Sequence, residues 1–386
     1  MDEKDSLSIL IAGDVVPTET NEDLFIKSNL EKMVGIEIIK LFNRTDISTI
    51  NLECALTEAN TPIDKCGPNL KAHPDSIKAI KELNPTLIGL ANNHIMDFGE
   101  KGLNDTLSVL DKYAFPYIGI GKNLNEASQS IHIIEKKGWK IGFYACAEHE
   151  FTIATSSKLG ANPFEPLTTG DIIKSLKSKH NLDKLIVLYH GGKEYYQYPS
   201  PNLQRVCHHL VEKGADLVVC QHSHCIGAHE KYQSGDIVYG QGNFIFDTSH
   251  ALSTESVLVE LVIEEEKQKL RFHPIKRRKD ETLYLAKDKE AQTILSGLEE
   301  RSRFIKEDGF IEKNYSEFAK QMLSSYLLNL SPFGKWFSRI DRYIFKGRLI
   351  KNLYKKRKLL ILRNMIECEA HREVILKGLD NIKISD

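Results

Sequence analysis

Over roughly the first two thirds of the chain, short apolar runs alternate with stretches of helical periodicity. LSILIAGD (7–14) and ISTINLE (47–53) have the length and composition of buried strands. GEKGLNDTLSVLDKY (99–113) instead spaces its leucines as one face of a helix. Short apolar strands that alternate with helices predict an α/β protein of layered sheets with many parallel strand pairs.

The pattern changes after about residue 250. The stretch 255–278 reads as two antiparallel strands around a charged turn, and from about residue 288 the periodicity becomes helical. The helical stretches are 289–305 and 316–331. We therefore predict one domain over residues 1–290 and a helical, basic extension over residues 291–386.

Charge is distributed unevenly along the chain. The formal net charge is -1, which favours no nucleic-acid partner, yet residues 335–363 carry 11 Lys and Arg against one acid, Asp341. Trp336, Phe337, Ile340, Ile344 and Phe345 are interleaved with these cations. The segment is either a packed helix with a solvated basic face or an amphipathic helix that contacts a membrane surface or a polyanion.

The termini and the cysteines bear on the cellular compartment. The N-terminal MDEKDSLSILIAGD lacks the basic and apolar regions of a secretory signal, and no apolar run is long enough to span a bilayer. The seven cysteines are scattered and odd in number, which is not a disulfide framework. We expect a cytoplasmic protein, with the basic segment as a candidate for peripheral membrane contact.

Five of the apolar runs end in residues that can bind a metal or move a proton. Because α/β proteins place their sites at the carboxyl ends of strands, these side chains are expected to converge. Taken singly, each has a structural alternative, such as a helix cap for an aspartate or a buried hydrogen-bonded imidazole for a histidine. The residues are Asp14, Glu53, Asn93, His94, His190, His222 and His224.

The stretch CQHSHC (220–225) places two cysteines and two histidines within six residues. A structural zinc site would need paired cysteines at closer spacing and a second ligand pair, which the sequence lacks. In an extended segment, His222 and His224 would point to the same side and reach one site. Oxygen and imidazole ligands together suit one or two divalent ions such as Mn, Fe, Zn or Ni.

A longer series of motifs resembles a known family. GDVV, NLECALT, LKAHP, LANNHIMDFGEKGLNDTL, HGGKEYYQYPSP and GNFIFD occur in this order between about residues 7 and 290. The series resembles the CapA family of capsule or poly-γ-glutamate biosynthesis proteins, within the calcineurin-like metallophosphoesterase superfamily. The resemblance implies a four-layer αββα sandwich with a metal centre at one edge, whereas the helical, basic C-terminus lies outside the matching motifs.

The resemblance also implies roles for the strand-end residues. Asp14 and His224 would hold a first metal, Glu53 would bridge, and the second metal would take Asn93, His190 and His222. His94 would be the acid that protonates the leaving group. Val16 stands where the superfamily usually has a histidine, so the first metal would have one ligand fewer.

Two functions are compatible with these residues. The first is a metal-dependent hydrolase that cleaves a phosphoester or a γ-glutamyl amide in an anionic small molecule or polymer. The second is a non-hydrolytic role in making or exporting an anionic capsule polymer. Candidate substrate-binding residues are Lys71, Lys193, Glu194, Tyr195 and Asn243.

Overall fold

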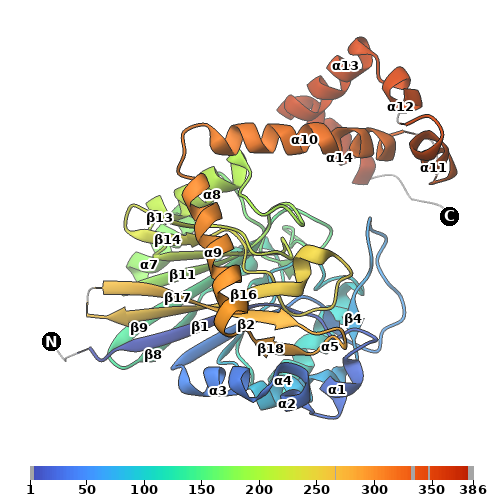
Figure 1. Cartoon of the computed structure of the whole chain (residues 1–386). Coiled ribbons are helices and arrows are strands. Elements are labelled where there is room, and N and C mark those ends of the chain that lie inside the picture. Colours follow the sequence, from blue (N-terminus) through green and yellow to red (C-terminus); the bar gives the residue numbers. More distant parts are fainter. Residues whose placement is uncertain (1–3, 266, 332–334, 347, 381–386) are drawn as a thin grey trace. The chain divides into compact units, whose positions relative to one another are not determined.

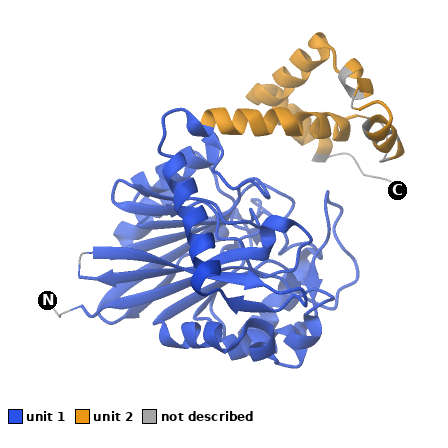
Figure 2. Cartoon of the chain, in the orientation of Figure 1, with its two compact units in different colours: residues 1–311 blue, residues 312–386 orange. Residues whose placement is uncertain are grey.

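The computed structural model describes residues 4–265, 267–331, 335–346 and 348–380. It contains two compact units, residues 1–311 and 312–386 (Figure 2). The boundary predicted between residues 290 and 291 falls inside helix α9 (Asp288–Phe304). This helix buries Ile294 and Leu298 in the core of the first unit, so the division comes after Ile311 instead.

The first unit is built on two large β-sheets (Figure 1). One has eight strands in the order β18-β17-β16-β1-β2-β5-β6, with β15 also paired to β1. Strand β1 runs parallel to β2 and β15 and antiparallel to β16, and β16 and β17 form the predicted antiparallel pair. The strands are β1 (Leu7–Val15), β2 (Ile47–Leu52), β5 (Leu87–Gly89), β6 (Tyr117–Ile118), β15 (Asn243–Ile245), β16 (Glu255–Glu264), β17 (Lys267–Arg277) and β18 (Leu283–Leu285).

The second sheet has six strands in the order β13-β14-β12-β11-β9-β8. Its centre is parallel, because β11 pairs in parallel with both β9 and β12. The strands are β8 (His132–Lys136), β9 (Trp139–Ala147), β11 (Lys184–His190), β12 (Leu217–Gln221), β13 (His229–Tyr232) and β14 (Gly235–Val238). Two short pairs lie outside these sheets: β3 (Ala55–Leu56) with β4 (Lys71–Ala72), and β7 (Ile120–Gly121) with β10 (Gly160–Ala161).

Successive side chains of a strand point to opposite faces of its sheet, and in both sheets the two faces are buried. In β1, Ile9 and Ile11 lie in the core between the two sheets, whereas Leu10 lies in the core beneath the first group of helices. In β9, Phe143 lies in the core between the sheets, whereas Tyr144 lies beneath the second group of helices. The two sheets therefore pack face to face.

Helices cover the outer face of each sheet and complete the predicted four-layer αββα sandwich. The first sheet is covered by α1 (Glu22–Ile26), α2 (Leu30–Val34), α3 (Ile36–Arg44), α4 (Ile77–Leu83) and α5 (Gly99–Lys112). The second is covered by α7 (Thr169–Lys179) and α8 (Pro201–Glu212), and the short α6 (Leu124–Ser128) follows β7. The stretch predicted as a helix over residues 99–113 is α5.

Gly13 fixes the position of Asp14 at the end of β1. A Cβ atom on Gly13 would lie 2.3 Å from the carbonyl oxygen of Gly242, far inside van der Waals contact. Only glycine therefore lets β1 approach the residues before β15 so closely, and Asp14 then pairs in register with Asn243. The close approach at Gly13 therefore positions Asp14 at the carboxyl end of β1, beside β15.

The second unit consists of helices joined by short connections, which agrees with the predicted helical extension. They are α10 (Phe310–Asn329, which begins two residues before the boundary), α11 (Lys335–Tyr343), α12 (Arg348–Leu353), α13 (Lys356–Glu367) and α14 (Glu369–Asp380). Among the described residues, none of the helices combines the length and apolar character needed to traverse a bilayer. The seven cysteines are free thiols in the structure.

Candidate metal centre

The carboxyl ends of the parallel strands in both sheets bring five predicted ligands together. Asp14 lies near the end of β1 and Glu53 directly follows β2, while His190 ends β11 and His222 and His224 follow β12. Their ligand atoms form two groups, Glu53 with His190 and His222, and Asp14 with Glu53 and His224. Within each group the atoms lie within 4.8 Å of one another, and all five residues are buried. Glu53 belongs to both groups.

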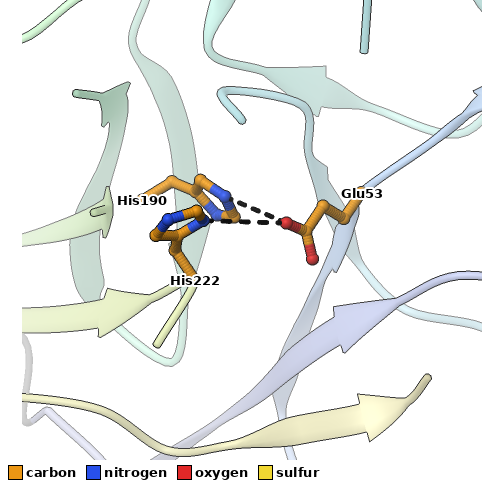
Figure 3. Close-up of side chains that lie close together, drawn as sticks. All are labelled: Glu53, His190 and His222. Atoms are coloured by element: carbon orange, nitrogen blue, oxygen red, sulfur yellow. Dashed lines mark ion pairs between the residues drawn. The ribbon is translucent and has the colours of Figure 1, made fainter. Parts of the chain in front are cut away.

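The first group joins the two sheets across the core (Figure 3). His190 Nε2 lies 3.2 Å from Glu53 Oε1, and His222 Nδ1 lies 4.0 Å from the same oxygen. The amide oxygen of Asn93 lies 3.0 Å from His190 Nε2, so the predicted neutral ligand stands beside this group. The group thus offers a carboxylate, two imidazoles and an amide oxygen.

The second group is held by amides that the sequence analysis did not assign to it. Asn51 Nδ2 donates to Asp14 Oδ1 at 2.7 Å, and the other carboxylate oxygen lies 3.7 Å from His224 Nδ1. His224 Nδ1 donates to Asn243 Oδ1 at 2.8 Å, since an amide oxygen only accepts. The ring's lone pair is then on Nε2. Val16, which stands where a histidine ligand is usual, has a buried hydrocarbon side chain and offers no ligand atom.

The donor atoms fit divalent metal ions. Neither carboxylate oxygen of Glu53 nor Nδ1 of His222 has a hydrogen-bond partner among the described residues, although all three atoms are buried. Burial, together with the charge of Asp14, raises the pKa of Glu53 to about 8. An unpaired buried carboxylate is costly unless a cation compensates it, and a divalent ion between these donors would do so.

The imidazoles of the first group are in the protonation state that binds metals. Burial lowers the pKa of His190, and it lowers the pKa of His222 well below the ordinary value, with the neighbouring His190 adding to the effect. Both rings are therefore neutral near neutral pH. Since a metal coordinates the neutral imidazole, neither ring has to lose a positive charge before it binds.

His222 and His224 reach the site by a different backbone path from the one predicted. The extended pairing expected for them is wrong, because β12 ends at Gln221 and both histidines have positive φ angles, 85° and 53°. The left-handed conformation is unfavourable for a non-glycine residue and is often retained at functional sites. The turn brings the two ring centroids to 5.8 Å from one another.

His94 lies outside both ligand groups and has its own partners. Its Nδ1 donates to Asp97 Oδ2 at 2.6 Å. Lys65 Nζ donates to Asp97 Oδ1 at 2.7 Å and to the carbonyl oxygen of Asn93 at 3.2 Å, and it lies 3.3 Å from His94 Nδ1. The ion pair between Lys65 and Asp97 is almost completely buried. It therefore fixes the orientation of the imidazole.

Four residues around the site were not identified from the sequence, namely Asn51, Lys65, Asn92 and Asp97. Asn51 precedes Glu53 by two positions, so strand alternation places both on one face and could have revealed it. Asn92 donates to Asn51 Oδ1 at 3.2 Å and accepts from the backbone N–H of His94 at 3.1 Å. Asp97 is three residues after His94, a spacing that allows contact within one turn.

The predicted substrate-binding residues do not all lie beside the candidate ligands. The ring of Tyr195 lies 5.8 Å from that of His224 and stacks on His250, while Lys193 and Glu194 are half-buried on the same loop. Asn243 uses its amide oxygen on His224 and donates to the carbonyl oxygen of Phe246, so it positions a ligand. Lys71 donates to Ala59 and Asn60 and lines a separate cavity of about 760 Å³.

Comparison with known proteins relates the chain to a bacterial family. Residues 8–248 match a family described as bacterial capsule synthesis protein PGA_cap. A capsule biosynthesis protein CapA of Bacillus anthracis is 32% identical over 200 residues, which are 50% of this chain and 47% of that protein. A PGA biosynthesis protein CapA of Bacillus subtilis (strain 168) is 30% identical over 195 residues, half of each chain.

The chain thus spans about half the length of these two relatives. Among solved structures, a phosphatase from Mycoplasma pneumoniae aligns over 70% of this chain and 94% of its own, with 14% identity and a TM-score of 0.45.

The pKa of Glu53 predicts an unusual dependence of stability on pH in the metal-depleted protein. The folded state keeps the Glu53 proton to about pH 8, whereas the unfolded chain loses it near 4.5. Between these values the folded state binds more protons, so the free energy of unfolding should fall as pH rises. Urea unfolding of chelator-treated protein from about pH 6.5 to about pH 8 measures this slope.

The matched control is Glu53→Gln, which has no carboxyl proton to lose and should show a flatter slope over the same interval. Equal slopes for the two proteins would show that Glu53 is ionised in the folded state and would contradict the assignment.

Proposed function

The chain belongs to the PGA_cap family of bacterial capsule synthesis proteins, and on that premise we propose that it is a metal-dependent hydrolase of phosphoester type. The observation that supports this most strongly is Glu53, which has two buried oxygens without hydrogen-bond partners and belongs to both ligand groups. A carboxylate in that position suits a pair of adjacent divalent ions, for which Mn, Fe, Zn and Ni are candidates.

The ligands have distinct tasks in this proposal. Asp14 and His224 would hold one ion, His190, His222 and Asn93 would hold the other, and Glu53 could serve both because it belongs to both ligand groups. When bound there, divalent ions would supply Lewis acidity and lower the pKa of a bound water. The tight burial of all these groups excludes bulk water and strengthens their electrostatic effect.

His94 supplies the proton in this proposal. Because Nδ1 is engaged by Asp97, Nε2 is the ring atom that exchanges a proton with the leaving oxygen of the substrate. Asp97 stabilises the imidazolium, and Lys65 compensates the charge of Asp97 when the imidazole is neutral. Such general acid catalysis contributes about 10²- to 10⁴-fold to a rate.

We further propose that the substrate is anionic and belongs to the metabolism of a capsule or poly-γ-glutamate polymer. Two observations support an anionic substrate: the family description refers to capsule synthesis, and the half-buried Lys193 lies close enough to lower the pKa of His222 by its charge. Tyr195, packed between His224 and His250, gives a flat surface at the same edge of the site.

Hydrolysis by the purified protein tests the proposal directly. With Mn, Zn or Ni we expect turnover of an aryl phosphate or a phosphodiester, and His222→Ala should lower kcat/KM by at least about 10²-fold because one metal loses a ligand. His180→Ala, which alters a histidine at the end of α7, is the matched control and should leave the rate unchanged.

Three results would contradict this account. The first is no turnover of any phosphoester with any of the metals, and the second is the same rate for His222→Ala as for the wild type. Turnover of a γ-glutamyl peptide alone would replace phosphoester chemistry with amide hydrolysis at the same site.

The role of His94 predicts a dependence on the leaving group. Asp97→Asn removes the charge that stabilises the His94 imidazolium, so it should slow phenyl phosphate at least about tenfold more than p-nitrophenyl phosphate, whose better leaving group needs less protonation. The ratio of the two kcat/KM values is the measurement, because a general loss of folded protein lowers both equally. An unchanged ratio would show that His94 does not protonate the leaving group.

A further inference from the structure

Exposed large hydrophobic side chains are concentrated in the second unit. Among the described residues, only Ile36, Phe151 and Leu167 of the first unit fall in this class, whereas the second unit contributes seventeen. A soluble helical unit normally turns such side chains inward. This excess indicates that the surface of the second unit binds another molecule or a membrane.

Helix α11 presents a regularly spaced part of this surface. Trp336, Ile340 and Tyr343 are spaced four and three residues apart, so they share one face of the helix, and they are 76%, 42% and 78% exposed. Ile344 and Phe345 follow directly and are also exposed. We call these five residues the α11 apolar face. The side chain of Phe337, which the sequence analysis grouped with them, lies outside the described residues.

Positive charge surrounds this face. The guanidinium of Arg339 lies 5.5 Å from the centroid of the Trp336 ring, and Lys346 and Arg348 are exposed just beyond the face. The single acid of the segment, Asp341, is buried and accepts from the backbone N–H of Leu349 at 2.9 Å.

We propose that the α11 apolar face binds the surface of an anionic lipid bilayer. Trp and Tyr side chains favour the boundary between head groups and acyl chains, and Lys and Arg beside them pair with lipid phosphates. A helix of nine residues is about 14 Å long, so it lies along the interface. Its apolar side chains enter the lipid while the cations stay at the head groups.

The positive charge and the exposed aromatic residues favour a bilayer over two other binding partners of the α11 apolar face. A second copy of the chain would bring two segments of net charge +10 together, which opposes self-association through this face. A soluble polyanion would neutralise the cations but would leave Trp336 and Tyr343 in water. An anionic bilayer satisfies both the charged and the apolar groups.

The intrinsic fluorescence of the full chain tests the proposal, and it requires no hydrolytic activity. The chain has two tryptophans, of which Trp139 is buried and Trp336 is exposed. Vesicles of phosphatidylcholine and phosphatidylglycerol should shift the emission to shorter wavelength and protect it from acrylamide, whereas pure phosphatidylcholine vesicles should not. The change should disappear in Trp336→Phe.

A second variant tests the α11 apolar face and keeps Trp336 as the fluorescent reporter. Ile340→Ser combined with Tyr343→Ser should weaken binding to the anionic vesicles at least about tenfold, because two apolar side chains no longer enter the lipid. The matched control is Leu376→Ser with Leu379→Ser, which alters two equally exposed leucines on α14 and should bind as the wild type does.

Several outcomes would overturn the proposal. They are no spectral change with anionic vesicles, an equal change with neutral vesicles, and wild-type binding by the double variant of α11. An equal Trp336 shift on adding soluble poly-L-glutamate would assign the surface to a polyanion. Dimers in sedimentation that the α11 variant abolishes, without any vesicle binding, would assign it to a second copy of the chain.

Discussion

The structure is organised around one buried carboxylate whose two oxygens have no hydrogen-bond partner in the described part of the chain. Glu53 follows β2 at the point where the parallel strands of both sheets end, and its Oε1 faces both His190 and His222 across the core. Burial raises its pKa, and the adjacent Asp14 raises it further. A protein keeps such a group only if something offsets its desolvation. The surrounding nitrogen and oxygen donors are what a divalent cation requires.

The neighbouring side chains hold these donors in place and do not compete for them. Asn51 bonds Asp14, Asn243 bonds His224, and Asn92 ties the turn before His94 to the end of β2. Asn51 occupies one carboxylate oxygen of Asp14, and the bond to Asn243 fixes the protonated ring nitrogen of His224. The buried pair of Lys65 and Asp97 acts in the same way on His94. These hydrogen bonds and the buried ion pair therefore hold the candidate ligands and His94 in place.

Much of this arrangement could be predicted from the sequence, because buried strands and the residues at their ends have recognisable patterns. Asp14, Glu53 and His190 are candidate ligands because they lie at such ends, whereas their separate roles and the four-layer order follow from the family resemblance. The left-handed turn at His222 has no local signature, since histidine rarely adopts it. Lys65 comes from an irregular loop whose sequence shows no periodicity. The boundary was placed too early because α9 is largely polar and buries only a few side chains such as Ile294.

The central claim is that Glu53 bridges two divalent ions, and electron paramagnetic resonance of the Mn(II)-loaded protein tests it most directly. The account predicts two Mn(II) ions per chain with an exchange-coupled spectrum, and Glu53→Gln should convert this to the spectrum of isolated Mn(II) or abolish binding. A wild-type protein that binds one isolated Mn(II), or whose coupled spectrum survives in Glu53→Gln, would contradict it.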